Sequence, residues 1–162
     1  MPAKILIVSD THGNNTNLRK AIANMGENLD LMVHLGDFMC HPDVIRGLVD
    51  CPVEMVRGNC DSLSSIQSAK LIDIAGHKAF ITHGHTYGGK WGIDTMKDIA
   101  RENGAGIVMF GHTHEPMADK TPGMAVINPG SLSRPRQDGG RPTYIVMTVK
   151  DNGDTDYSVV YI

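Results

Sequence analysis

Two histidine pairs of the form His-x-His are the residues whose type and spacing most directly suggest chemistry. One pair is His83 and His85, and the other is His112 and His114. Each pair directly follows an apolar run that reads as a strand. Imidazole nitrogens are common ligands of transition metals. Two such pairs at two strand ends therefore favour metal binding over a purely structural role.

Three further apolar runs also lead into polar residues of ligand type. Asp10 and His12 follow the first run. Asp37 and Asn59 each follow a glycine at the end of a later run. Any one of these residues alone is explained equally well as a turn or a helix cap. In open α/β sheets, however, sites form at the carboxyl ends of strands, so together these strand ends indicate a single site.

The elements that would position these residues alternate between strand and helix in the first half of the chain. Near-continuous apolar runs predict strands covered on both faces at residues 3–8, 31–35, 53–56 and 107–110. A hairpin is predicted from residues 71–75 and 78–82, and further strands at 125–127, 143–149 and 157–162. Apolar residues at helical spacing predict helices at residues 18–25, 42–49 and 93–100. This order predicts a mixed α/β fold with more than one sheet. Three histidines that fall within these elements are interpreted as structural: His34, His41 and His77.

Length and composition exclude several classes of protein. The chain has 162 residues and no repeat or linker, so we expect a single domain over residues 1–162. Its 15 Lys and Arg against 18 Asp and Glu give a net charge of −3, which argues against a dedicated nucleic-acid or membrane-surface binder. Three cysteines cannot form a closed disulfide set, and no apolar run is long enough for a membrane span or a signal peptide. We therefore expect a cytoplasmic protein with no membrane partner and no stable nucleic-acid partner.

The ligand-type residues, taken in chain order, resemble the calcineurin-like metallophosphoesterase superfamily. That superfamily carries the pattern DxH, GD, GN(H/C), H and GHxH. The matching positions here are Asp10-Thr11-His12, Gly36-Asp37, Gly58-Asn59-Cys60, His83 and Gly111-His112-Thr113-His114. The compact length and Asn128-Pro129-Gly130-Ser131 resemble its small, YfcE-like phosphodiesterase branch. The resemblance implies an α/β fold of four layers, α/β/β/α, in which two mixed β-sheets pack as a sandwich with flanking helices.

The resemblance also implies a dinuclear metal centre. By matching position, one metal ion would be bound by Asp10, His12, Asp37 and His114. The other would be bound by Asp37, Asn59, His83 and His112, with Asp37 bridging the two ions. Mixed imidazole, carboxylate and amide ligands suit borderline divalent ions. We therefore expect two divalent transition metal ions, Mn²⁺ first, with Ni²⁺, Co²⁺, Fe²⁺ and Zn²⁺ as alternatives.

The activity that the resemblance implies is hydrolysis of a small phosphodiester by a hydroxide that bridges the two ions. The expected catalytic residues are Asn59, Cys60, His83 and His85. His85 would either support a ligand or face the substrate. Many superfamily members have His where this chain has Cys60, and a thiol is a weaker proton donor than an imidazolium. We therefore expect a preference for diesters with good leaving groups. Arg134 and Arg136 either contact the substrate anion or belong to a solvated loop.

Three other classes of function fit the residues less well. A metallo-β-lactamase-type hydrolase needs HxHxDH, whereas this chain reads His112-Thr113-His114-Glu115-Pro116. A metal-storage module would need neither an asparagine ligand nor a bridging aspartate. The alternative we retain is a catalytically inactive scaffold that binds protein partners, as in the small retromer subunit, although such scaffolds normally lack ligands that are all present here. Trp91 and the C-terminal strand are candidate contacts in a homo-oligomer.

Overall fold

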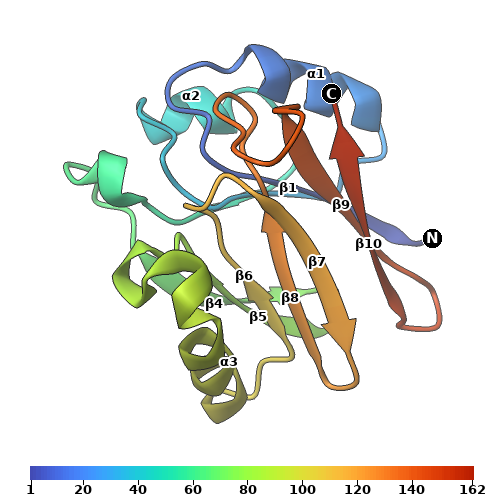
Figure 1. Ribbon diagram of the computed structural model, residues 1–162. Helices are drawn as coiled ribbons and strands as arrows, with labels where there is room; N and C mark the ends of the chain where they lie inside the picture. Colours follow the sequence, from blue (N-terminus) through green and yellow to red (C-terminus); the bar gives the residue numbers. More distant parts are fainter.

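A computed structural model describes residues 1–162 (Figure 1). The strands of one sheet are β1 (Ala3–Val8), β2 (Leu31–His34), β3 (Val53–Met55), β9 (Thr143–Val149) and β10 (Thr155–Tyr161). The other five are β4 (Ala69–Ile74), β5 (His77–Thr82), β6 (Ile107–Met109), β7 (Pro116–Thr121) and β8 (Met124–Pro129). The α-helices are α1 (Thr16–Met25), α2 (Pro42–Arg46) and α3 (Ile93–Glu102). Short 3₁₀ helices are η1 (Asn59–Asp61), η2 (His85–Tyr87) and η3 (Gly89–Gly92).

The strands form two five-stranded sheets that pack face to face. The first sheet has the order β10-β9-β1-β2-β3 and the second β4-β5-β6-β8-β7. Both sheets are mixed: β1 is parallel to β2 and antiparallel to β9, and β6 is parallel to β5 and β8 while β7 is antiparallel to β8. The expected sandwich of two mixed sheets is confirmed.

Three apolar clusters define four layers. The central cluster lies between the sheets and includes Ile7, Val33 and Ile81. A second cluster packs α1 and α2 against the outer face of the first sheet, and a third packs α3 against the outer face of the second. The helices accordingly lie on opposite sides of the two sheets in Figure 1. Strand β1 supplies side chains to both faces of its sheet, which explains why residues 5–8 are apolar without alternation.

Two elements differ from the sequence-based expectation. Helix α2 ends at Arg46 with Gly47 as its cap, although apolar residues at helical spacing continue to Val49. Strand β7 was not expected, because it begins at a proline and its last four residues are exposed. It pairs antiparallel with β8 at the edge of the second sheet, where a proline and an exposed face are tolerated.

The parallel strands bring the carboxyl ends of both sheets to one end of the sandwich. In the first sheet, β1, β2 and β3 are parallel neighbours, and in the second, β5 and β6 are parallel neighbours. The turn after β1 contacts the turn after β6, because the backbone N–H of His112 donates to Asp10 Oδ2 at 3.1 Å. The residues that follow these five strands therefore converge at one end of the molecule.

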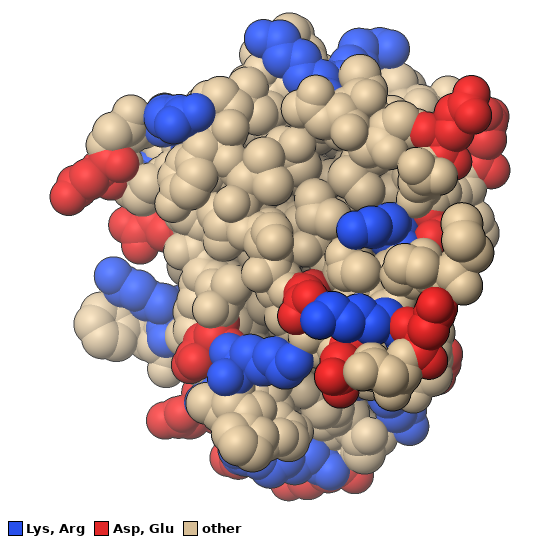
Figure 2. Space-filling model, turned by 90° about the vertical axis from the view of Figure 1, so that its right-hand side faces the viewer, with Lys and Arg blue, Asp and Glu red and all other residues tan.

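The surface shown in Figure 2 mixes charges of both signs. Lys and Arg lie among Asp and Glu along the margins and across the lower part of this face, which carries β10 and β7, and they do not gather into a single basic patch. No helix in the chain has both the length and the apolar character that crossing a membrane requires.

The three histidines interpreted as structural lie outside the cluster of ligand-type residues. His41 caps the N-terminus of α2 by accepting from Asp43 N, and His77 Nε2 lies 2.8 Å from Gly153 O. His34 is fully buried and accepts a hydrogen bond at Nδ1 from Gly36 N, so its Nε2 carries the proton and donates to Thr11 Oγ1. Burial lowers the pKa of His34 to about 4.

The buried, neutral His34 predicts a specific dependence of stability on pH. Its ordinary pKa is near 6.5 and its folded pKa is about 4, so its contribution is complete above about pH 6.5 and is lost as the pH falls toward 4. By this linkage the metal-free protein loses about 2–3 kcal/mol through His34 between pH 7 and pH 4.5. The variant His34→Gln keeps a polar side chain but does not titrate. Urea denaturation at both pH values should show a smaller loss in the variant, and equal losses would contradict the assignment.

Candidate metal centre

Each ligand-type residue lies in the turn that follows a strand. Asp10 and His12 follow β1, and Asp37 follows β2. Asn59 opens η1 after β3, and His83 follows β5. The turn after β6 carries the last pair, His112 and His114. The strands fix the backbone positions of these residues, and the turns direct their side chains into one cluster.

The structure brings all seven predicted ligand residues together. One group has its ligand atoms within 4.8 Å of one another and consists of Asp10, His12, Asp37 and His114. A second group, within the same limit, consists of Asp37, His83 and His112. Asn59 Oδ1 lies 3.1 Å from both His83 Nε2 and His112 Nδ1, which adds the amide oxygen to the second group. Asp37 is the residue that both groups share.

Two of the imidazoles are oriented by backbone carbonyl groups. His83 Nδ1 lies 2.6 Å from Leu35 O, and His114 Nδ1 lies 2.6 Å from Arg134 O. A carbonyl oxygen only accepts hydrogen bonds, so each Nδ1 carries a proton and donates it. When either ring is neutral, its Nε2 atom therefore carries the lone pair that faces the cluster. This arrangement of a hydrogen-bonded second nitrogen is typical of metal-binding histidine.

The two carboxylates are held in the charged form. Burial would raise the pKa of Asp10, but the neighbouring His114 and His12 imidazoles and the Ser9 hydroxyl lower it far below its usual range. Burial likewise opposes ionisation of Asp37, yet the hydrogen bond from His83 lowers its pKa as well. The site therefore holds two negative charges in a largely buried position.

The charge on the imidazoles follows from the same contacts. Burial would lower the pKa of His83, but its hydrogen bond to Asp37 and the charge of Asp10 raise it. Burial, followed by the charge of His83, lowers the pKa of His112 and of His85. Neutral imidazole is the form that binds a metal ion, so an ion would displace a proton from His83 on binding.

The donor set fits divalent cations. Asp10 Oδ1 is buried, has no hydrogen-bond partner and lies 3.2 Å from His114 Nε2. A buried carboxylate oxygen without a partner is costly, and a cation would satisfy it. The cluster contains imidazole, carboxylate and amide donors and lacks thiolate, a combination that suits borderline divalent ions.

The backbone at these positions is left-handed rather than extended. Positive φ angles occur at the candidate ligands Asp10, His12, Asp37, His112 and His114, with values between 47° and 69°. In an extended chain, residues two apart point the same way, so the spacing of Asp10 and His12 alone predicts a shared target through an extended segment. The two residues do meet, but through a left-handed turn, so that local geometry is wrong. Such conformations are costly for residues other than glycine, and they persist where the surroundings fix them. Ser131 Oγ and Ser133 Oγ donate to Asp10 O at 2.7 and 3.0 Å, which fixes the first turn.

Asp61 is a supporting residue that the sequence analysis missed. Its buried carboxylate accepts from the backbone N–H groups of Asp37 at 2.6 Å, Met39 at 2.9 Å and Gly58 at 2.9 Å. These bonds hold the strained turn that carries Asp37. The available signal was its position directly after Cys60, at the end of the Gly-Asn-Cys-Asp segment. Ser131, which also lies in a quoted motif, was likewise not given a role.

Two glycines of the motifs are required by close packing. A Cβ at Gly58 would collide with Asp37 Oδ1, and a Cβ at Gly111 would collide with Ser9 Oγ. Ser9 Oγ in turn donates to Asp10 Oδ2 at 2.6 Å. The glycine before a ligand thus allows a neighbouring carboxylate or its hydrogen-bond donor to approach the backbone.

The remaining candidate residues border the cluster. The ring centres of His85 and His83 are 5.4 Å apart, and His85 belongs to neither ligand group. Cys60 is exposed and donates through its backbone N–H to Asp37 Oδ1 at 2.8 Å. Burial, followed by the charge of Asp37, raises the pKa of the Cys60 thiol. The exposed Arg134 and Arg136 contact His114 through their backbones, by Arg134 O and Arg136 N.

Comparison with known proteins assigns the chain to a family of metal-dependent enzymes, in agreement with the cluster of metal-ligand residues. Residues 3–152 match the family model described as the calcineurin-like phosphoesterase superfamily domain, so the chain belongs to this family. Its relatives include proteins named as metallophosphoesterases and "Phosphodiesterase YfcE" of Escherichia coli, which is 27% identical over 171 residues that cover 91% of this chain and 88% of YfcE, and they support the YfcE-like branch. The chain is therefore a hydrolase that acts on phosphoester bonds.

Two relatives illustrate the similarity in sequence. "Probable metallophosphoesterase YsnB" of Bacillus subtilis is 31% identical over 154 residues, which cover 93% of this chain and 87% of YsnB. "Phosphodiesterase MJ0936" of Methanocaldococcus jannaschii is 33% identical over 145 residues, which cover 78% of this chain and 82% of that protein.

Solved structures share the fold. A predicted phosphoesterase from Streptococcus pneumoniae has a TM-score of 0.81 at 22% identity, covering 100% of this chain and 99% of that one. Vps29 of Entamoeba histolytica complexed with zinc has a TM-score of 0.73 at 21% identity and covers 98% of each chain. At these identities the similarity establishes the architecture alone.

The close contact at Gly111 gives a prediction about the integrity of the site. In Gly111→Ala the added methyl group collides with Ser9 Oγ and displaces the Asp10 carboxylate. We expect a loss of about 1–3 kcal/mol in the free energy of unfolding, as for other overpacked sites, together with weaker binding of Mn²⁺. Urea denaturation and calorimetric Mn²⁺ titration measure the two effects.

A matched control is Gly106→Ala. Gly106 also has an ordinary φ, but its added Cβ would lie 3.4 Å from Gly123 O, which is far less crowded. This variant should bind Mn²⁺ like the wild type. Equal Mn²⁺ affinities for wild type and Gly111→Ala would show that the turn after β6 does not position Asp10.

Proposed function

We propose that this protein is a dinuclear metal-dependent phosphodiesterase that hydrolyses small phosphodiesters with good leaving groups. The observation that carries the proposal is the shared position of Asp37. Its carboxylate belongs to both groups of ligand atoms, one with Asp10, His12 and His114 and the other with His83 and His112. A carboxylate placed between two sets of imidazoles is suited to bridging two ions.

The residues of the two groups, with Asn59, would hold two divalent transition metal ions, Mn²⁺ first, with Ni²⁺, Co²⁺, Fe²⁺ and Zn²⁺ as alternatives. When bound, such a pair supplies positive charge for the phosphate oxygens and lowers the pKa of a water molecule to make a nucleophile. Asp10 and Asp37 contribute only two negative charges, so the loaded site keeps a positive charge that attracts an anionic diester. Two bound ions would thus let a chain whose own net charge is −3 bind a phosphate group.

The side chains around the centre have separate proposed roles. His83 and Asn59 act as ligands whose positions also define where the phosphate sits. His85 lies beside His83, and its buried Nδ1 has no partner, so we assign it to contact with a phosphate oxygen. The guanidinium groups of Arg134 and Arg136 are proposed anion contacts at the rim, because their backbones are fixed to His114.

Cys60 determines the proposed preference for leaving groups. Its exposed thiol lies in the turn that contacts Asp37, and its pKa is raised, so it stays protonated near neutral pH. A donor with a high pKa transfers a proton poorly to a leaving alkoxide. Esters of nitrophenol need no such help, because the phenolate leaves as a stable anion.

Removal of the bridging carboxylate tests the metal mechanism. Purified protein is loaded with Mn²⁺ and assayed with bis(p-nitrophenyl) phosphate, before and after chelation by EDTA. We expect metal-dependent turnover in the wild type and a loss of about 10²-fold or more in Asp37→Asn. The control Asp119→Asn changes an exposed aspartate on β7 and should retain activity.

Metal content measured on the same samples separates the proposed function from its alternative. Wild-type protein that binds the ions yet turns over no diester with any of the five metals would support the protein-binding scaffold. Protein that binds fewer than two ions per chain would rule out the dinuclear centre.

The role of Cys60 is tested by exchanging the proton donor. Cys60→His supplies an imidazole, for which general-acid assistance is typically worth about 10²–10⁴-fold. We expect the rate on thymidylyl-thymidine, which has an alkoxide leaving group, to rise at least about tenfold relative to the rate on bis(p-nitrophenyl) phosphate. Cys60→Ser is the control, because a hydroxyl is no better as a donor. An unchanged ratio of the two rates in Cys60→His would refute this role.

A further inference from the structure

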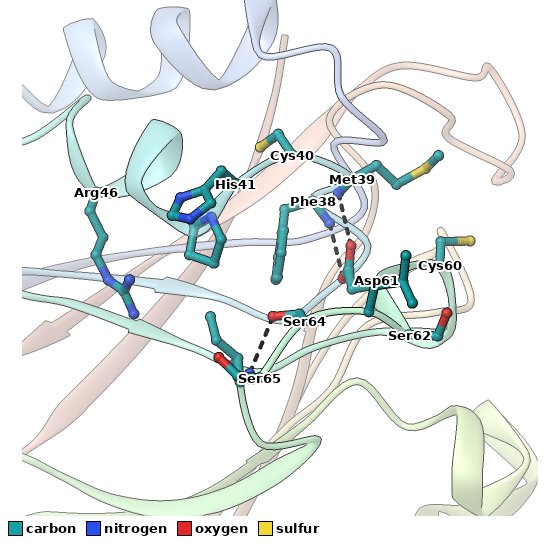
Figure 3. A pocket seen from close by; sticks show the side chains of 13 residues that line it. Phe38, Met39, Cys40, His41, Arg46, Cys60, Asp61, Ser62, Ser64 and Ser65 are labelled. Carbon is teal, nitrogen blue, oxygen red and sulfur yellow. Dashed lines mark hydrogen bonds between the residues drawn. The ribbon is translucent and has the colours of Figure 1, made fainter.

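A pocket of about 640 Å³ adjoins the metal centre. It lies between the start of α2 and the segment after η1, and Figure 3 shows its lining side chains. Cys60 and Met39 lie toward one end of the pocket and Arg46 toward the other. A volume of this size is in the range that holds small organic ligands. Of its lining residues, only Cys60 and Asp61 have roles at the metal centre assigned above.

The end of the pocket at Met39 and Cys60 borders the metal centre. Met39 Sδ lies 3.2 Å from His12 Nδ1, and Cys60 N donates to Asp37 Oδ1 at 2.8 Å. The residues that border the pocket are therefore in direct contact with two of the candidate ligands. This end of the pocket is therefore the part nearest to the place where the proposed function puts the phosphate.

One carboxylate fixes both the pocket wall and the candidate bridging ligand. Asp61 lines the pocket and accepts from the backbone N–H groups of Asp37, Phe38 and Met39. Figure 3 shows two of these bonds, those from Phe38 and Met39. The wall of the pocket is thus held in a constant position relative to Asp37, as a substrate-binding site requires.

The lining of the pocket combines apolar, hydroxyl and cationic groups. Met39 and Leu63 are 48% and 101% exposed, and such apolar side chains are available to cover the body of a ligand. Ser62, Ser64 and Ser65 add hydroxyl groups along the segment after η1. Ser64 Oγ accepts from Ile66 N at 3.2 Å, which leaves its own proton to donate.

Arg46 provides the positive charge at the far end. Its only ion pair is with Asp43 Oδ1, on the same helix, at 3.3 Å from Nη1. The guanidinium has five N–H donors in a planar fork, so most of its donors remain free for an anion. Arg46 is about half exposed and Asp43 is more exposed, at 48% and 76%, so the pair leaves the guanidinium accessible from the pocket.

We propose that this pocket binds one ester arm of the substrate, and that this arm has a ring-sized body ending in an anionic group. This inference rests on the proposed phosphodiesterase function and specifies its substrate class. The scissile phosphate lies at the metal centre, the body of the arm lies along the serine-rich segment, and its terminal phosphate or carboxylate pairs with Arg46. A nucleotide and a phosphorylated sugar both have this chemistry.

The test compares two chromogenic substrates that share the same reacting group. One is the p-nitrophenyl ester of thymidine 5′-phosphate, and the other carries an additional 3′-phosphate. With the Mn²⁺-loaded wild type we expect the 3′-phosphate to raise kcat/KM about five- to tenfold, mainly through KM, as suits a partly exposed charge-assisted contact. In Arg46→Gln this ratio should fall to about one.

The matched control is Arg101→Gln. Arg101 lies on α3 and pairs with Asp98 at i−3, also at 3.3 Å, in the arrangement that Arg46 has with Asp43. This variant should keep the wild-type ratio between the substrates. A wild-type ratio of one, or an equal loss in both variants, would overturn the pocket assignment. The p-nitrophenyl phosphodiester of a phosphorylated sugar is assayed in the same way. If it gains as much in kcat/KM as the nucleotide ester, the pocket recognises the ring and its terminal anion and not the nucleobase.

A binding measurement separates failure of this inference from failure of the proposed function. Thymidine 3′,5′-bisphosphate and thymidine 5′-phosphate are titrated calorimetrically into the Mn²⁺-loaded protein. The bisphosphate should bind about five- to tenfold more tightly to the wild type, and Arg46→Gln should abolish the difference. If neither chromogenic ester is hydrolysed but this difference appears, the pocket is supported and the hydrolytic function is not. If hydrolysis occurs without the difference, the pocket assignment is wrong.

Discussion

Two carboxylates are held close together in a largely buried site, and this constraint shapes the rest of the structure. Asp10 and Asp37 lie within one group of ligand atoms, and both have lowered pKa values, so their charges repel each other across a short distance. Imidazole nitrogens surround them. The turns adopt costly left-handed conformations to achieve this arrangement. The neighbouring imidazoles offset this repulsion, and the surrounding sandwich holds the strained turns in place.

The support for this site comes from polar residues placed behind the ligands. Asp61 holds the turn of Asp37, while Ser131 and Ser133 hold the carbonyl of Asp10. These side chains are buried or half-buried and act on backbone atoms, so they restrict where the carboxylates lie without competing for their oxygens. Gly58 and Gly111 also support the site, because their lack of a side chain leaves space for Asp37 and Ser9. A substitution in this supporting set would disturb the site although it removes no ligand.

The sequence predicted the ligand positions better than it predicted their surroundings. The strands before Asp10, Asp37 and His112 are short apolar runs buried on both faces, and that pattern is visible without a structure. Strand β7 was missed because an edge strand with an exposed face has no such pattern. The end of α2 was placed too late, since apolar spacing continues past Gly47 although the helix does not.

The spacing of residues in the sequence also did not predict the backbone conformation of the site. The left-handed turn at Asp10 is held by hydrogen bonds from residues more than one hundred positions away, such as Ser131. The role of Asp61 depends on the approach of the turn after β2 to η1, which sequence proximity does not reveal. Arg46 lies on a short helix with no motif of its own, and only the fold shows that it faces the pocket beside the centre.

The ligand residues come from both sheets, and this has a thermodynamic consequence for the whole molecule. Asp10, His12 and Asp37 follow strands of the first sheet, and the other histidines of the cluster follow strands of the second. An ion held between them would bind the assembled sandwich and not the separated strands of an unfolded chain. By mass action, free metal at one hundred times its dissociation constant would add about 2.7 kcal/mol to the stability of the fold. The fraction of folded protein would then follow the supply of metal, so that scarcity of the ion would act on the lifetime of the protein as well as on its catalysis.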